Sequence, residues 1–207
     1  TGNELEDDEY NRDLTSDIYM VDRESGDPRT LTSNPGSESA PALSPAGTQL
    51  AFLQTRARGE ATNLRIVDLA TDGTFRGISR NLTRDWDMTP GAPTWAANGE
   101  AVRFLAGVSG GRHLFEVTVT GDLIRQLTIG DRQVRSMSTS EDGLVMAYTV
   151  TDATSPAEVY VNRGDGTRQR RVTAFNDEWL TNVSLQPAER LTWTVADGTE
   201  IEGWLIK

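Results

Sequence analysis

The sequence predicts an all-β protein, a partial β-propeller of about four blades followed by a C-terminal β-hairpin. Three observations predict this fold. Apolar and polar residues alternate over short runs, helical patterning is almost absent, and a repeat of about 45–51 residues runs along the chain. Regular short strands, about four to a repeat, are typical of a propeller, in which small twisted sheets stack and cover one another's faces.

Two landmarks define the repeat. One is a strand-like run whose starts are 46, 50 and 45 residues apart, at Asp17, Asn63, His113 and Glu158. The other is an apolar residue followed by threonine, at Leu31-Thr32, Leu82-Thr83, Leu127-Thr128 and Val172-Thr173. Landmarks that recur in the same order at the same spacing indicate repeated structural elements rather than unrelated hairpins.

A third landmark is a turn that leads into a strand, within residues 44–52, 96–104 and 140–148. Each turn contains a glycine, which supplies the positive φ that a tight hairpin needs. Each strand ends near an aromatic residue, Phe52, Phe104 or Tyr148. We expect these aromatic side chains to pack between blades.

The landmarks divide the chain into three segments. Residues 1–15 form an acidic lead-in, residues 16–175 form the blades, and residues 176–207 leave the last blade and form a hairpin. Strands over 191–195 and 200–206, joined by Asp197-Gly198, are expected in that hairpin. About four blades and a start at Thr1 rather than at a methionine favour a piece of a larger propeller.

The composition excludes several classes of protein. The 207 residues include no cysteine and one histidine, so a disulfide scaffold, a cysteine zinc site and a zinc site of two or three histidines are all excluded. No apolar run is long enough to span a bilayer. A net charge of −11 argues against nucleic acid as the main partner. We expect no cofactor, no metal, no membrane partner and a cytoplasmic location, with secretion or a periplasmic location left open.

Most of the negative charge lies at the start of the chain. Residues 1–22 carry a net charge of −7, and the other 185 residues carry −4. A block of like charge is usually a solvated segment. Alternatively, some carboxylates bind the α-amino group of a peptide, or calcium, although no EF-hand spacing is present. The candidate substrate-binding residues are Glu4, Glu6, Asp7, Asp8 and Glu9.

The run Gly107-Val108-Ser109-Gly110-Gly111 matches the G-x-S-x-G pattern of a nucleophile elbow, and His113 follows it. The elbow needs a strand before the serine and a helix after it. Residues 114–119 instead alternate like a strand, and the run falls where the other repeats have a loop between strands. We therefore interpret Ser109 as part of a turn and predict no catalytic residue in this chain.

Two stretches resemble a known family. Both resemble the acylaminoacyl-peptidase and dipeptidyl-peptidase-5-like members of the prolyl oligopeptidase family. The first stretch is Leu82-Thr83-Arg84-Asp85-Trp86-Asp87 with the turn at 93–99, and the second is the segment 176–207. In the second stretch Asp197-Gly198 and Gly203-Trp204-Leu205 carry most of the resemblance. The chain departs from the family's Ser-Pro-Asp-Gly turn at Ala46 and at 96–98.

The resemblance implies a two-domain serine peptidase, of which this chain is the later part of the propeller. In that family the hairpin within residues 176–207 is the first hairpin of a C-terminal α/β-hydrolase domain. The catalytic serine, aspartate and histidine follow it, so they belong to the missing remainder of that domain. The propeller then caps the active site and admits only short peptides. The alternative is a TolB-like propeller that binds proteins and has no enzyme domain. A stand-alone four-bladed enzyme or lectin is disfavoured, because no acids or histidines recur at matching positions. Open blade faces also predict self-association.

Overall fold

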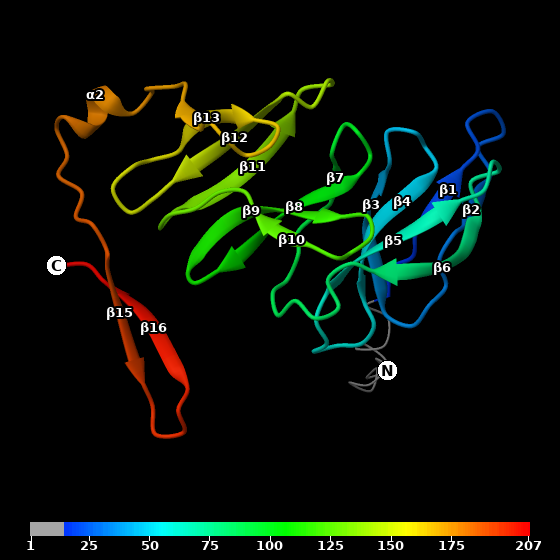
Figure 1. Cartoon of the computed structure of the whole chain (residues 1–207), viewed down its shortest axis with the longest axis horizontal. Helices are drawn as coiled ribbons and strands as arrows, with labels where there is room; N and C mark the ends of the chain where they lie inside the picture. The colour runs from blue at the N-terminus through cyan, green and yellow to red at the C-terminus, as the bar shows by residue number, and fades with distance from the viewer. Residues whose placement is uncertain (1–14) are drawn as a thin grey trace, which may run out of the picture. The chain divides into compact units, whose positions relative to one another are not determined.

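The computed structural model describes residues 15–207, and their regular structure is almost entirely β (Figure 1). The one helix among the described residues is the single turn α2 (Asp177–Leu180). No helix in this part of the chain is long and apolar enough to cross a membrane. The chain forms two compact units, which are described separately: unit 1 reaches Ala106 and includes Phe115–Arg125, and unit 2 comprises Gly107–Leu114 and Gln126–Lys207.

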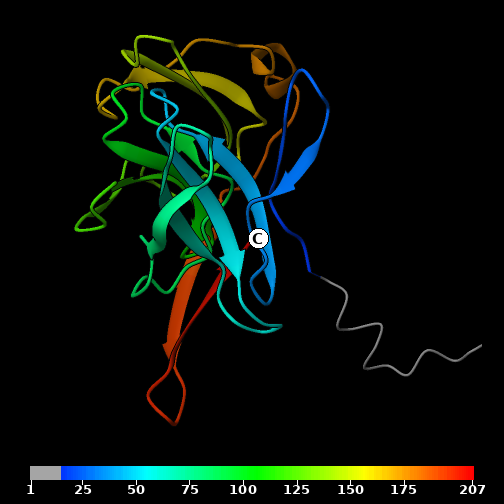
Figure 2. The same cartoon turned by 90° about the vertical axis from the view of Figure 1, so that its right-hand side faces the viewer.

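Unit 1 begins with a two-stranded sheet and continues with a four-stranded blade. All of these strands pair antiparallel in sequence order. The two-stranded sheet consists of β1 (Tyr19–Val21) and β2 (Pro28–Thr30). The blade consists of β3 (Ser37–Leu43), β4 (Gln49–Thr55), β5 (Asn63–Leu69) and β6 (Phe75–Asn81). Figure 2 shows the long blade strands lying side by side.

A second blade follows, with its strands again in sequence order. It consists of β7 (Thr94–Trp95), β8 (Ala101–Val108), β9 (Gly111–Thr118) and β10 (Ile124–Gln126). The tip of the β8–β9 hairpin belongs to unit 2, and the rest of β8 and β9 belongs to unit 1. Within unit 1 the indole Nε1 of Trp95 donates a hydrogen bond of 2.8 Å to the carbonyl of Ala42 in β3.

The core of unit 1 contains two of the aromatic residues that the repeat predicts. Phe52 is 1% exposed and packs with Ile18, Leu50 and Val67. Phe104 is fully buried and stacks on Phe115, with 6.0 Å between ring centroids. Because Ile18 lies next to the β1–β2 sheet, Phe52 joins two neighbouring sheets of unit 1.

Unit 2 contains the third blade and the C-terminal hairpin. The blade consists of β11 (Gln133–Thr139), β12 (Val145–Thr151), β13 (Glu158–Arg163) and β14 (Arg170–Arg171), and all of its neighbouring strands are antiparallel. β11 also pairs with β9 in parallel at Gln133 and Arg112. The hairpin consists of β15 (Glu189–Thr194) and β16 (Glu200–Leu205).

The repeated threonine has the same hydrogen bond in every repeat. Its hydroxyl accepts a hydrogen bond from the backbone N–H of the apolar residue that is second in the strand-like run. The four pairs are Thr32 with Ile18 at 2.8 Å, Thr83 with Leu64 at 2.9 Å, Thr128 with Leu114 at 2.9 Å and Thr173 with Val159 at 2.8 Å. We call these residues the latch threonines. Three of the N–H groups belong to buried residues, and a buried N–H without an acceptor lowers the stability of the fold. The need to pair this N–H explains why a threonine recurs at the same position of each repeat.

The predicted fold class is confirmed, since four-stranded antiparallel blades recur at the predicted positions and their sheets do not close on themselves. The turn glycines Gly47, Gly99 and Gly143 have the expected positive φ. The hairpin is present where the Asp197-Gly198 turn predicts it. The assignment of residues 1–15 as a lead-in and of residues 176–207 as the start of another domain stays a prediction.

Candidate functional site

Ser109 lies in a tight β-turn. Ser109 and Gly110 are the two residues that join β8 to β9, and their φ values are +46° and +69°. Positive φ at both central residues defines the type I′ turn that suits a two-residue hairpin. A strand follows the serine where a nucleophile elbow would need a helix. The prediction that this sequence match is a turn is confirmed.

His113, the single histidine of the chain, has a structural position. Its side chain is 5% exposed, and its Nδ1 lies 3.4 Å from the hydroxyl of the latch threonine Thr128. Burial and the nearby Arg132 lower the pKa of the imidazole, which keeps the ring neutral at pH 7. Asp17 and Glu158 occupy the same place in their repeats and also accept a hydrogen bond from a latch threonine. Asp17, His113 and Glu158 thus recur at one position of the repeat, so the prediction that no acids or histidines recur at matching positions is wrong. Each of the three contacts the latch threonine of its own repeat, which gives the position a structural role.

Glu158 is the most strongly perturbed carboxylate of unit 2. The residue is 2% exposed and accepts hydrogen bonds from the Thr173 hydroxyl and from the backbone and side-chain nitrogens of Asn176, both at 2.9 Å. The bond from Thr173 and those from Asn176 lower its pKa to about 2, against the opposing effect of burial. The carboxylate fixes the exit from β14 and is not free to bind a ligand.

The C-terminal hairpin has one polar and one apolar face. Residues that pair across an antiparallel ladder share a face. Arg190 with Trp204, Thr192 with Glu202 and Thr194 with Glu200 form the polar face. The other face carries Leu191, Trp193, Ile201 and Leu205, and three of them, Leu191, Trp193 and Leu205, are 39%, 50% and 40% exposed. In both views the hairpin extends away from the rest of unit 2 (Figures 1 and 2).

The polar face of the hairpin is fastened to the blade at Trp204. The indole ring lies against Gly110, and a Cβ at Gly110 would overlap it. The guanidinium of Arg190 lies 5.5 Å from the centroid of Trp204 and donates hydrogen bonds to the Ser109 carbonyl at 2.8 Å and to Asp131 Oδ1 at 3.2 Å. We call this arrangement of Trp204, Arg190 and the Ser109–Gly110 turn the Trp204 clasp.

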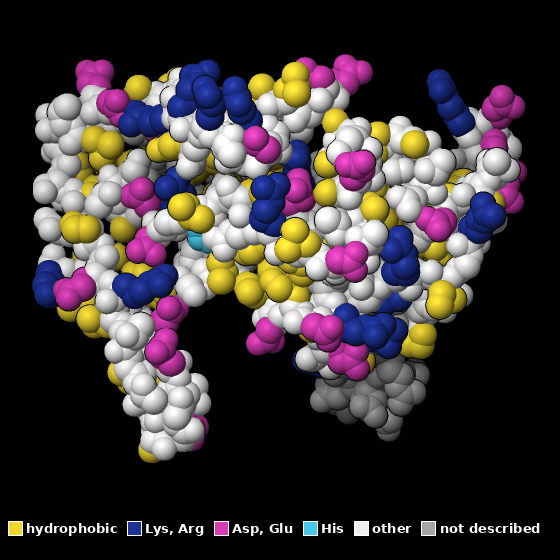
Figure 3. Space-filling model, viewed as in Figure 1, with side chains coloured by type: hydrophobic (Ala, Val, Ile, Leu, Met, Phe, Trp, Pro, Cys, Tyr) yellow, Lys and Arg dark blue, Asp and Glu magenta, His cyan; other side chains and the backbone are white. Residues whose placement is uncertain are grey.

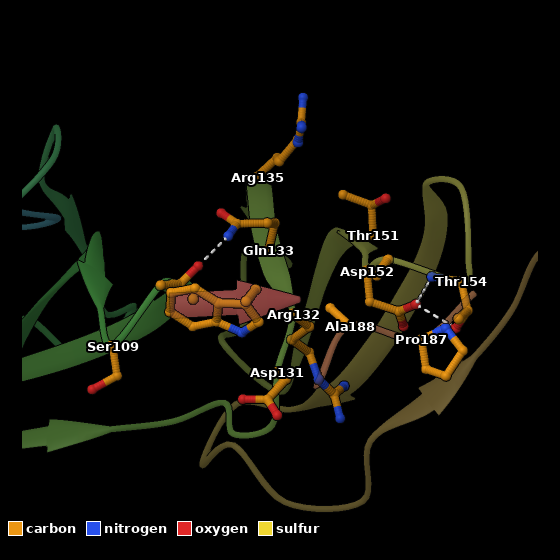
Figure 4. Close-up of a pocket in the computed structure, with 14 residues that line it drawn as sticks. Ser109, Asp131, Arg132, Gln133, Arg135, Thr151, Asp152, Thr154, Pro187 and Ala188 are labelled. Carbon is orange, nitrogen blue, oxygen red and sulfur yellow. Dashed lines mark hydrogen bonds between the residues drawn. The ribbon is translucent and has the colours of Figure 1, made fainter. Parts of the chain in front are cut away.

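A pocket of about 460 Å³ lies beside the clasp, wholly within unit 2 (Figure 4). The start of β11, the loop between β12 and β13, the segment before β15 and Trp204 line it. A second pocket of about 420 Å³ shares Asp131, Arg132 and Asp152 with the first and continues to β14. The two pockets adjoin at these shared residues, and we call them together the arginine groove.

Sequence reasoning did not find the arginine groove. The groove is lined by Arg132 and Arg135 at one edge of the third blade and by Arg170 and Arg171 at the other. The available signal was the concentration of arginine in residues 163–171, where Arg163, Arg168, Arg170 and Arg171 stand against one acid, Asp165. Figure 3 shows basic side chains gathered over β13 in an otherwise acidic protein.

The acidic candidates Glu4, Glu6, Asp7, Asp8 and Glu9 lie outside the described residues, so their proposed contact with a peptide stays a prediction. Between residues 15 and 207, no group of three or more histidine and acidic side chains is arranged to hold a metal ion.

The fold defines a β-propeller domain, and comparison with known proteins gives its relatives. No family model matches the chain. It is 26% identical to dipeptidyl-peptidase 5 of Porphyromonas gingivalis over 202 residues, which are 95% of this chain and 28% of that protein. A dipeptidyl-peptidase 5 of Trichophyton schoenleinii is 29% identical over 38% of this chain and 11% of its own length. The chain thus spans between 11% and 28% of the length of these curated relatives.

Solved structures share the fold. The acylaminoacyl peptidase of Pyrococcus horikoshii aligns with a TM-score of 0.70 at 20% identity over 92% of this chain and 28% of its own. TolB of Acinetobacter baumannii aligns with a TM-score of 0.59 at 16% identity over 92% of this chain and 46% of its own. The sequence relatives include dipeptidyl-peptidase 5 proteins, and the fold neighbours include propellers of acylaminoacyl and prolyl peptidases. The predicted resemblance is confirmed.

Proposed function

We propose that this chain is the non-catalytic propeller portion of a serine-type peptidase and that it caps the active site, so that only short peptides reach the catalytic serine. The catalytic residues would lie in an α/β-hydrolase domain that follows the hairpin. The observation that carries the proposal is the hairpin β15–β16. It is clasped to the blade on its polar face, while Leu191, Trp193 and Leu205 on the other face are 39–50% exposed among the described residues. The similarity to dipeptidyl-peptidase 5 supports it.

An uncovered apolar face of this size suits a domain interface. A two-stranded ribbon is at best marginally stable in water, and large apolar side chains are rarely left in a contiguous exposed patch. We infer that the first strands of the hydrolase domain cover this face in the longer protein. The hairpin would then connect the two domains, and the Trp204 clasp would set the position of the cap.

The test compares substrates of different size in the longer protein. The purified 207-residue chain should not cleave peptide p-nitroanilides, whereas the longer protein should cleave them and spare the same sequence in a folded substrate. Trp204→Ala should raise the cleavage of long peptides relative to short ones, and Trp179→Ala, at an exposed tryptophan of α2, is the control. Cleavage by the 207-residue chain, or equal rates for short and folded substrates, would refute the proposal.

The alternative is a TolB-like module that binds a protein and lacks an enzyme domain, a fold that the TolB similarity also fits. Such a module has no evident use for a clasped hairpin with an exposed tryptophan after its last blade. A longer protein without peptidase activity that retains a stable protein partner through affinity purification would favour this alternative.

Self-association through an open blade face also belongs to this proposal. Ala51, Leu64 and Ile66 share one face of the β4–β5 pair and are fully buried. Their counterparts in the third blade, Ala147, Val159 and Val161, are only half-buried. We expect a further blade to cover this face in the longer protein and a second copy to cover it in the isolated chain. Light scattering that shows a clean monomer at high concentration would contradict the second expectation. A cytoplasmic location stays a prediction, which cell fractionation can check.

A further inference from the structure

We propose that the arginine groove binds a carboxylate group of a peptide and that Arg132 is the residue that recognises it. This inference rests on the proposed function, because that function supplies peptides to the propeller. The observations behind it are the position of Arg132, the hydrogen bonds that occupy the neighbouring acids, and the apolar side chains along the groove.

Arg132 lies where the two pockets of the groove adjoin. It lines both of them, directly before β11, and its side chain is half-buried. The guanidinium folds over Gly130, where a Cβ would come within 3.1 Å of Nε. Arg135 points the other way in Figure 4, so the two arginines do not share a ligand. Arg132 thus places a partly buried positive charge at the point that the two pockets share.

The acids of the groove have other partners. Asp131 accepts a hydrogen bond from Arg190 at 3.2 Å. Asp152 Oδ1 accepts two from Thr154, at 2.8 Å from the backbone nitrogen and 2.9 Å from the hydroxyl, as Figure 4 shows. Neither carboxylate pairs with Arg132. Within residues 15–207, Arg132 and Arg170 form no ion pair, whereas Arg171 pairs with Asp177. The groove therefore has unused hydrogen-bond donors with positive charge.

Unused guanidinium donors favour a planar anion. A guanidinium presents five N–H donors in a fork that matches a carboxylate with two parallel hydrogen bonds. Trp204 and Pro187 beside one end of the groove, and Val150 and Tyr160 beside the other, offer apolar contact to the chain that carries the carboxylate. A net charge of −11 disfavours a long polyanion. These features fit a peptide with an acidic side chain or a free C-terminus.

The test uses matched peptides and the 207-residue chain. The probes are acetyl-Gly-Gly-Glu-Gly-Gly-amide, its Gln analogue, and the Gln peptide with a free C-terminal carboxylate. Dissociation constants are measured by calorimetry at low and high salt. We expect at least one carboxylate peptide to bind about tenfold more tightly than the neutral peptide, with a preference that falls as salt screens the charge. Tighter binding of the Glu peptide would indicate a side-chain carboxylate as the ligand, and tighter binding of the Gln peptide with a free C-terminus would indicate a C-terminal carboxylate.

Variants locate the site. Arg132→Gln should remove the preference for a carboxylate, and Arg170→Gln should weaken it. Arg76→Gln, at an exposed arginine of β6 in unit 1, should leave it unchanged. Near-ultraviolet circular dichroism checks that each variant is folded, and the wild-type comparison of Glu and Gln peptides stands even if Arg132→Gln does not fold.

Equal affinity for all three peptides, no binding up to millimolar concentration, or a full preference retained by folded Arg132→Gln would overturn the inference. The proposed function is read separately, from hydrolysis of neutral peptides by the longer protein. A longer protein that cleaves neutral peptides normally but shows no carboxylate preference would refute the arginine groove alone.

Discussion

The blade β3–β6 and the hairpin β15–β16 are built from the same kind of strand but differ in what covers them. In the blade, Phe52, Leu64 and Ile66 are at most 1% exposed. In the hairpin, Leu191, Trp193 and Leu205 are 39–50% exposed. The hairpin strands alternate apolar and polar residues, which is the pattern of a sheet with one covered face, whereas β4 is apolar from Leu50 to Leu53 and is buried on both faces. Under the proposed function this difference makes the hairpin one half of an interface, and the following predictions test that proposal.

Loss of a large side chain should have very different effects in the two regions. Phe52→Ala empties a buried position among Ile18, Leu50 and Val67, so it should lower the free energy of unfolding by about 3–5 kcal/mol. Trp193→Ala, on the open face of the hairpin, should change it by less than about 0.5 kcal/mol in the 207-residue chain. Urea denaturation followed by circular dichroism measures both. A large loss for Trp193→Ala would show that its face is already covered.

Loss of a latch threonine hydroxyl should lower the free energy of unfolding about as much as loss of a methyl group from the core. Thr83→Val keeps the shape of the side chain but leaves the N–H of buried Leu64 without its acceptor, which should cost about 1–3 kcal/mol. Thr192→Val, at an exposed position of β15, is the matched control and should have little effect. Equal effects of the two substitutions on the urea midpoint would show that the latch hydrogen bond adds no stability.

Two glycine substitutions distinguish the steric contact within the Trp204 clasp from the cost of backbone strain. Gly110→Ala and Gly26→Ala both place a side chain at positive φ, +69° and +75°, which costs about 1–2 kcal/mol. Only the Cβ at Gly110 would meet the Trp204 ring. We expect Gly110→Ala, unlike Gly26→Ala, to make residues 189–205 more susceptible to limited proteolysis. Identical cleavage patterns would mean that Trp204 does not hold the hairpin on the blade.

Protonation of Glu158 at low pH should weaken the hydrogen bonds that hold the segment after β14 against the third blade. The pKa of this carboxyl is about 2 in the folded chain and near 4.5 when unfolded, so its contribution to stability is complete above pH 4.5 and is lost as the pH falls toward 2. The stability difference between the wild type and Glu158→Gln should therefore shrink over that range. Denaturant midpoints at pH 6 and pH 3 measure it. A difference that does not depend on pH would contradict the assignment.

Ser109→Ala should have the smallest effect. The serine lies in a type I′ turn, and its carbonyl rather than its hydroxyl accepts the Arg190 hydrogen bond. Its replacement should leave peptide hydrolysis by the longer protein unchanged. A large loss of kcat would refute the assignment of Ser109 to a structural turn.

The sequence predicted those features that depend on local pattern. The repeat, the blade strands, the buried aromatics Phe52 and Phe104, and the Asp197-Gly198 hairpin all follow from alternation and turn chemistry over short stretches. The repeated threonines were visible, but their cause was not, because Thr83 and Leu64 are far apart in sequence and meet only when the strands pair. The arginine groove was missed for the same reason.

Hydrogen exchange of residues 189–206 tests the central claim most directly, namely that the open face of the hairpin is an interface with a catalytic domain. The measurement compares the 207-residue chain with the longer protein that contains it. We predict rapid exchange of β15 and β16 in the isolated chain and strong protection in the longer protein, while β4 and β5 are protected in both. Equal exchange of the hairpin in the two proteins would contradict the account.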